Sequence, residues 1–161
     1  MSVEILATGP ELIRQGIRGT EPVVEEMIQS AKKEIQVIAY VFTYNAMRVL
    51  DLLDQAARKG VKVAVTVNNL KEQESRVRTK LENLAVVASV FDFDDPHGKQ
   101  LHAKIVIADR TRAVVGSANF TWGGMFGNYE IGLLIEGEAV WNLSRVADAL
   151  SRLATPVQHT D

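Results

Sequence analysis

The sequence lacks cysteine and any long apolar run, and each absence removes a class of protein. Zero cysteines among 161 residues exclude a disulfide-stapled fold and fit a reducing compartment. No apolar segment approaches the roughly 20 residues that a membrane-spanning helix needs, which argues against integral membrane association. Acidic and polar residues interrupt the opening MSVEILATGPELIRQG before a signal-peptide core can form, so we expect a cytoplasmic protein.

Strong net charge of either sign is also missing. Lys and Arg number 18 and Asp and Glu number 20, for a formal net charge of −2. A polyanion such as nucleic acid or an anionic membrane must therefore meet a local patch, because the whole chain does not attract it. The length predicts one domain, 1–161, that buries roughly 68–70% of the surface its unfolded form exposes.

Alternating hydrophobic patterns predict an α/β fold. Apolar residues at helical spacing favour helices at 20–33, 46–59, 71–84 and 138–153. Runs rich in β-branched and aromatic residues favour strands at 34–42, 61–67, 86–91, 101–108, 113–116 and 129–135. We therefore expect a mixed, mostly parallel β-sheet flanked by helices on both faces.

Two of these strands carry polar residues where a buried strand needs none. His102 and Lys104 lie two positions apart and so project from the same face of their strand. If Asp109 and Arg110 centre the turn to the next strand, residues whose numbers sum to 219 pair, and Ser117 faces His102. Asn119 then lies just beyond, and one end of the hairpin gathers an imidazole, an ammonium, a hydroxyl and a carboxamide.

Such a group suits a phosphodiester. Lys104 supplies a positive charge, and Ser117 and Asn119 supply donors for the phosphate oxygens. Histidine side chains in general change charge between about pH 5 and 8, so the His102 imidazole can attack phosphorus in its neutral form or deliver a proton as imidazolium. Glu130 is the candidate carboxylate to orient its ring.

The spacing of these residues resembles the HKD motif of the phospholipase D superfamily. The motif is His102-x-Lys104, four residues and Asp109, followed by Gly116-Ser117-x-Asn119 and Asn128-x-Glu130. A looser likeness extends upstream to the segments 40–43 and 57–63, so most of the chain is covered. The resemblance implies a phospholipase D-like fold.

By the resemblance, one motif histidine forms a phosphohistidine intermediate and a second protonates the leaving oxygen, with no metal or other cofactor. This chain carries one motif, like the short family members typified by a bacterial endonuclease, which form homodimers with the site on the two-fold axis. His102 then serves as nucleophile in one subunit and general acid in the other. Lys104, Ser117 and Asn119 hold the phosphate, Glu130 orients His102, and Asp109 is more structural than catalytic.

The function expected from this resemblance is a homodimeric, metal-independent nuclease acting on DNA or RNA. Three alternatives stay open. The first is hydrolysis of phospholipid at a membrane surface, and the second is a non-catalytic nucleic-acid-binding or assembly module of a larger defence or repair complex. The third is a divalent-metal site in the loop 92–100, built from Asp92, Asp94, Asp95 and His97.

Overall fold

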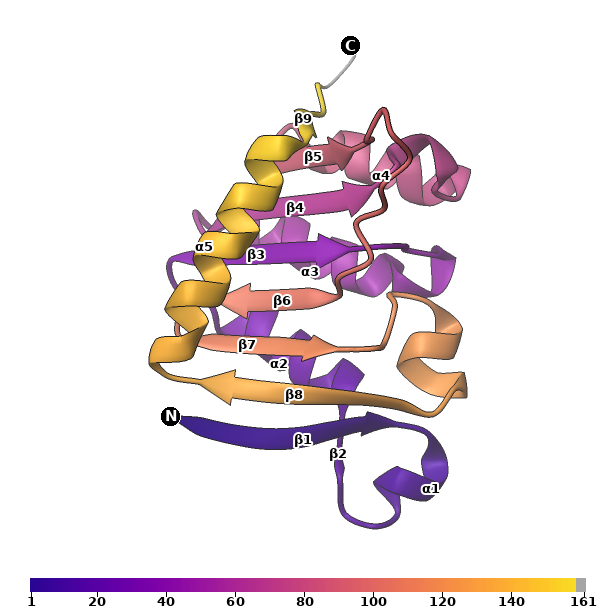
Figure 1. Ribbon diagram of the computed structural model, residues 1–161, viewed down its shortest axis with the longest axis vertical. Helices are drawn as coiled ribbons and strands as arrows, with labels where there is room; N and C mark the ends of the chain where they lie inside the picture. The colour runs from indigo at the N-terminus through magenta and orange to yellow at the C-terminus, as the bar shows by residue number, and fades with distance from the viewer. Residues whose placement is uncertain (159–161) are drawn as a thin grey trace.

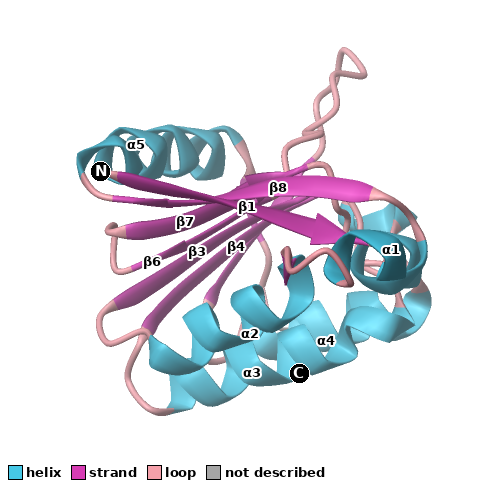
Figure 2. Ribbon diagram, turned by 90° about the horizontal axis from the view of Figure 1, so that it is seen from below, coloured by secondary structure: helices cyan, strands magenta, loops and turns pink. Residues whose placement is uncertain are grey.

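The structure, a computed structural model, describes residues 1–158 and has three layers. Figure 2 shows one sheet between helices α2, α3 and α4 on one face and α5 on the other. This arrangement confirms the α/β class and the prediction that helices cover both faces of a mixed sheet.

The elements follow in chain order along Figure 1. The strands are β1 (Ser2–Thr8), β2 (Arg18–Gly19), β3 (Glu34–Ala39), β4 (Lys62–Asn68), β5 (Ser89–Phe93), β6 (Ile105–Ala108), β7 (Arg112–Gly116), β8 (Glu130–Glu136) and β9 (Thr155–Pro156). The helices are α1 (Pro10–Ile13), α2 (Thr20–Ser30), α3 (Met47–Arg58), α4 (Ser75–Leu84) and α5 (Glu138–Leu153), with short turns η1 (Tyr44–Ala46), η2 (Leu70–Glu72) and η3 (Gly123–Gly127). None of the helices within residues 1–158 is long and apolar enough to cross a membrane.

The sheet is less parallel than we expected. Its strand order is β2-β1-β8-β7-β6-β3-β4-β5-β9. Over residues 1–158, three neighbouring pairs are parallel and five are antiparallel. Antiparallel pairs outnumber parallel pairs because β6, β7 and β8 form a meander, to which β1 adds antiparallel. The parallel part is limited to β3-β4-β5 and the short β1-β2 pair.

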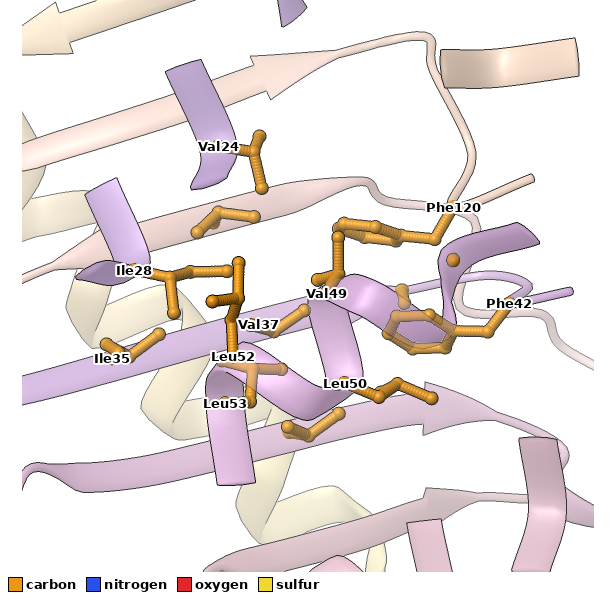
Figure 3. Close-up of a cluster of buried hydrophobic side chains, with 14 of the residues drawn as sticks. Val24, Ile28, Ile35, Val37, Phe42, Val49, Leu50, Leu52, Leu53 and Phe120 are labelled. Atoms are coloured by element: carbon orange, nitrogen blue, oxygen red, sulfur yellow. The ribbon is translucent and has the colours of Figure 1, made fainter. Parts of the chain in front are cut away.

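Two apolar layers hold the helices to the sheet. The larger lies under α2, α3 and α4, and Figure 3 shows Leu50 and Leu53 of α3 packed toward Val37 of β3. Phe42 and Phe120, from the segments that follow β3 and β7, pack at one end of this core with ring centroids 4.6 Å apart. The second layer lies under α5, around Ile38, Ile107 and Ala147.

Several predicted boundaries are wrong by a few residues, and within residues 1–158 three strands, β1, β2 and β9, were not predicted. Helix α5 has the predicted limits, and Gly60 ends the region of α3 with a φ of 92°, as a glycine after a helix does. The predicted helix 71–84 begins only at Ser75, because a 3₁₀ turn precedes it. No strand was predicted for β1, which pairs with β8 from Ser2↔Glu136 to Thr8↔Glu130.

Candidate active site

One edge of the sheet collects the predicted site residues. Strands β3, β4 and β7 end at this edge, and β6 and β8 begin there, at the right of Figure 1. The loop entering β6 brings His102 and Lys104, and the segment after β7 brings Ser117 and Asn119. Glu130 is the first residue of β8. The topology therefore gathers on one rim residues that are up to 28 positions apart in the sequence (130 − 102 = 28).

His102, Lys104 and Tyr40 form one cluster at this edge. The Lys104 Nζ lies 2.9 Å from Nδ1 and 3.2 Å from Nε2 of the His102 ring, and donates to the His102 carbonyl at 2.7 Å. Because an ammonium donates and cannot accept, the ring nitrogen that bonds to it carries a lone pair in this arrangement. The Tyr40 ring packs on His102 at 4.5 Å between centroids, tilted by 56°.

The surroundings of Lys104 change the pKa of its ammonium group. Burial lowers the pKa of the Lys104 ammonium below its ordinary value, and the negative charge of Glu130 partly opposes this effect. The Nζ also lies 5.4 Å from the centre of the Tyr40 ring, within the range of a cation–π interaction. Lys104 therefore bonds to His102 and is influenced by the charge of Glu130, although no ion pair joins Lys104 to Glu130 within residues 1–158.

The predicted hairpin register is wrong by one residue. The observed pairs, such as Ile105↔Val115 and Ala108↔Arg112, sum to 220 because the turn has three residues, 109–111. His102 is therefore not opposite Ser117. The site residues still meet, because His102 and Lys104 lie in the segment just before β6. This segment stays beside the end of β7, where the Lys104 carbonyl accepts a hydrogen bond from the Gly116 N–H at 3.3 Å.

Ser117 and Glu130 bond to each other, contrary to the roles that we expected for them. The Ser117 hydroxyl donates to the Glu130 carboxylate, which also accepts from Asn128 Nδ2 at 3.3 Å. Within residues 1–158, no hydrogen bond joins Glu130 to His102, so here Glu130 does not orient the ring directly. The Ser117 proton is engaged as well, and donating it to a phosphate requires the bond to Glu130 to break.

Asn119 is held by a close approach of two backbones. A Cβ added to Gly124 of η3 would lie 2.1 Å from the Asn119 carbonyl oxygen, so only glycine allows η3 to pack there. Thr8 Oγ1 donates to the Gly124 carbonyl at 2.8 Å and anchors the same turn. Among the described residues, the buried Asn119 Oδ1 has no hydrogen-bond partner, so it could accept a hydrogen bond from a bound group.

Asp109 lies outside this cluster. Asp109 is seven positions after His102, about 23 Å at 3.3 Å per residue of extended chain, and it directly follows the other end of β6. Its carboxylate accepts hydrogen bonds from the backbone N–H groups of Lys32, Lys33 and Glu34 at 2.7–3.2 Å. Burial alone would raise the pKa of Asp109, but these hydrogen bonds lower it below its ordinary value. Its inclusion among the catalytic residues is therefore not supported by its position.

The loop 92–100 does not form the metal site that we considered as an alternative. Asp92 accepts a hydrogen bond from the Leu70 N–H at 2.7 Å, and Asp95 accepts one from the His97 N–H at 2.8 Å. Across residues 1–158, no three His, Asp or Glu side chains are grouped so that they could hold a metal ion. The aspartates shape the turn instead.

Tyr40 is a site residue that the sequence did not identify in advance. It follows the last residue of β3, which pairs antiparallel with β6 through Ile38↔Ile105. The available signal was an aromatic residue near the end of the predicted strand 34–42. Recognising its contact with His102 required knowing that β3 and β6 are neighbours.

Comparison with known proteins assigns the family. Residues 24–151 match the family described as "Cardiolipin synthase, PLD-like domain". The chain therefore belongs to the phospholipase D superfamily, whose members are phosphodiesterases.

Two relatives and one solved structure locate the chain within this superfamily. It is 29% identical to the DISARM protein DrmC of Bacillus paralicheniformis, over 90% of this chain and 61% of the relative. It is 30% identical to cardiolipin synthase 1 of Bacillus cereus, over 89% of this chain and 28% of that protein. The structure of Nuc, a phospholipase D family member from Salmonella typhimurium, has the same fold with a TM-score of 0.81, at 21% identity and over 98% of both chains.

Proposed function

We propose that this chain is a nuclease that cleaves phosphodiester bonds of DNA or RNA at a site shared between two copies, without a metal. The observation that carries the proposal is the exposed His102 imidazole with the Lys104 ammonium 2.9 Å away. An ammonium at this distance can bind the non-bridging oxygens of a phosphate that the imidazole attacks. The single-motif endonucleases that the sequence resembles, and the match to Nuc over the whole of both chains, favour a nucleic acid.

The proposed reaction uses two histidines in turn. A lone pair of the neutral His102 ring forms an N–P bond while the P–O bond to the leaving oxygen breaks. The imidazolium of a second histidine gives its proton to that oxygen. Water then attacks phosphorus, the N–P bond breaks, and the second histidine takes the proton from the water, so both rings return to their starting states.

We infer that the second histidine comes from another copy of the chain. Within residues 1–158 the only other histidine is His97, exposed on the loop before β6, and His159 lies outside the described residues. A two-fold axis through the site edge would pair His102 with His102 of a second copy. Each dimer then carries one composite site.

An uncovered part of the sheet supports this dimer. Side chains of β1 and β8 that point to the α5 face stay exposed where α5 does not reach (Figure 1). They are Val3, Ile5, Ile131 and Leu133. Ile131 directly follows Glu130, so this apolar strip continues into the site edge. Exposed apolar patches mark contact sites, and pairing with a second copy across a two-fold axis would bury this strip.

Mixing subunits tests the composite site. Equal amounts of wild-type and His102→Ala protein, allowed to exchange, should leave about one quarter of the wild-type activity because only dimers with two intact histidines work. Independent sites would leave about half and would refute the shared site. His97→Ala protein serves as the control, and its mixture should keep full activity.

A charge placed on the apolar strip tests the interface. Ile5 and Val86 are both 58% exposed, but Val86 lies after α4 and outside the strip. Ile5→Lys should give a monomer by sedimentation and lose activity, whereas Val86→Lys should stay a dimer. A dimer in both variants would mean that another face pairs.

Lipid hydrolysis is the competing function, because the family description names cardiolipin synthase. Wild-type protein should be incubated with single-stranded, duplex and structured nucleic acids and with anionic lipid vesicles, all in excess chelator. Cleavage of vesicle lipid alone would replace the nuclease proposal. Binding without cleavage of any substrate would instead favour a module of a larger complex, and loss of nuclease activity in chelator would contradict the metal-free reaction.

A further inference from the structure

A cavity of about 480 Å³ adjoins the site through Tyr40, the residue whose ring packs on His102. It lies at the ends of β3, β4 and β5, beside the loop that descends from β5 to β6 in Figure 1. Phe93 and Tyr40 contribute aromatic surface to its lining. Because Tyr40 contacts both the cavity and His102, a group bound in the cavity would lie next to a phosphate at His102.

The cavity offers hydrogen-bond acceptors that the protein leaves unused. Of its three carboxylates, Asp95 bonds to backbone N–H groups of its own loop. Glu72 and Asp94 are exposed and make no ion pair or side-chain hydrogen bond within residues 1–158. These two side chains are free to accept hydrogen bonds from a ligand.

The cavity also offers one directed donor. Asn68 is only 8% exposed and lines the cavity. Its Oδ1 accepts a hydrogen bond from the Leu101 N–H at 2.7 Å, which fixes the orientation of the amide. Its Nδ2 then has no partner within residues 1–158. Asn68 therefore carries, on a mostly buried side chain, an amide donor that no described protein group uses and that a ligand in the cavity can engage.

The charge of the cavity excludes a second phosphate. Three carboxylates and one ammonium, that of Lys99, line it. A backbone phosphate would be repelled, whereas a neutral group with N–H donors would be attracted. Aromatic faces, carboxylate acceptors and one amide donor together fit the face and edge of a nucleobase.

We propose that this cavity binds the unpaired nucleobase next to the scissile phosphate and prefers bases with an exocyclic amino group. The proposal rests on the nuclease function. The cytosine amino group donates to the carboxylates, and its ring nitrogen can accept from Asn68 Nδ2. Thymine has a carbonyl oxygen in place of the amino group, and this oxygen is repelled by Glu72 and Asp94. A base in a duplex has its pairing edge occupied, so the substrate is single-stranded at this position.

The test compares homopolymeric single-stranded oligonucleotides of equal length, one of deoxycytidine and one of thymidine. Wild-type kcat/KM should be about tenfold higher on cytosine, the value of one hydrogen bond to a charged group. Glu72→Gln and Asp94→Asn should each reduce this ratio, and the double variant should bring it close to one. Glu138→Gln, an exposed carboxylate at the start of α5, should keep the wild-type ratio.

The possible failures are distinguishable. If the wild type cleaves both oligonucleotides at equal rates, the cavity does not select the base, but the nuclease function stands. If it cleaves no oligonucleotide yet hydrolyses bis(4-nitrophenyl) phosphate, the nucleic-acid assignment fails as well. If the cavity variants alter hydrolysis of phosphatidylcholine vesicles and not the base ratio, the cavity holds a cationic headgroup and the proposal is overturned.

Discussion

The pair Gly116 and Gly132 allows a sharp test of how β7 and β8 support the site. They lie opposite each other in the sheet, and neither has a positive φ. A Cβ on Gly116 would lie 2.8 Å from the Gly132 Cα and 2.8 Å from the Ile131 carbonyl oxygen. A Cβ on Gly132 would meet nothing closer than 3.5 Å. The same substitution therefore has different consequences on the two strands.

The magnitude follows from these distances. Ordinary contact begins at 3.4 Å, so Gly116→Ala forces the β8 backbone to move by 3.4 − 2.8 = 0.6 Å. Overpacking of this kind costs about 1–3 kcal/mol, and a chain of this length loses roughly 2–4 °C of melting temperature per kcal/mol. Gly132→Ala should be neutral or should stabilise by about 0.4–1 kcal/mol, because it restricts only the unfolded chain.

Thermal unfolding followed by circular dichroism, at one protein concentration because a dimer's melting depends on it, measures the difference. We expect Gly116→Ala to melt roughly 2–12 °C below the wild type, from the same magnitudes, and Gly132→Ala at or above it. We also expect hydrolysis to fall in Gly116→Ala alone, since Ser117 follows directly. Equal melting temperatures for the two variants would refute the argument that close backbone approach requires glycine at position 116.

Two further predictions concern charged groups. Asp109→Ala should lower the free energy of unfolding by about 1.5–3 kcal/mol at neutral pH. Because the folded pKa of Asp109 is lowered, this difference should persist above about pH 4 and disappear as the pH falls through that pKa; a difference that is constant with pH would contradict it. Glu130→Gln should lower the pKa of Lys104 further, measured by NMR titration of Nζ, because the lost carboxylate favoured the ammonium. Glu136→Gln, at the far end of β8, should leave that titration unchanged, and an equal shift in both variants would disprove the local effect.

Patterns that depend on neighbours in sequence predicted the fold well. Helix α5 shows its buried positions, Val140, Ser144 and Ala147, at helical spacing, and periodicity alone located it. Strand β1 could not be found in this way, because its first four residues are exposed and its partner β8 is more than 120 positions away. Pairing over such a distance leaves no local signal.

The hairpin register failed for a related reason. Asp109 and Arg110 adopt left-handed backbone angles, with φ of 53° and 56°, in a three-residue loop. Asp109 is held there by the backbone that precedes β3, and Arg110 by Glu34 and by Asp148 of α5. These partners are 38–77 positions away in the sequence, so the turn residues alone did not reveal them. Without these partners, Asp109 and Arg110 favoured a two-residue turn.

The position of Asp109 suggests why the motif that contains His102 also includes a residue at the other end of β6. Asp109 ends β6 and binds the backbone at the start of β3, and His102 and Tyr40 lie beyond the opposite ends of these two strands. Pinning β6 to β3 at one end fixes the register Ile35↔Ala108 through Ile38↔Ile105. A one-residue slip would move His102 by about 3.3 Å relative to Tyr40 and turn its side chain to the other face. We therefore expect Asp109 to influence the position of the imidazole through the register of β6 and β3.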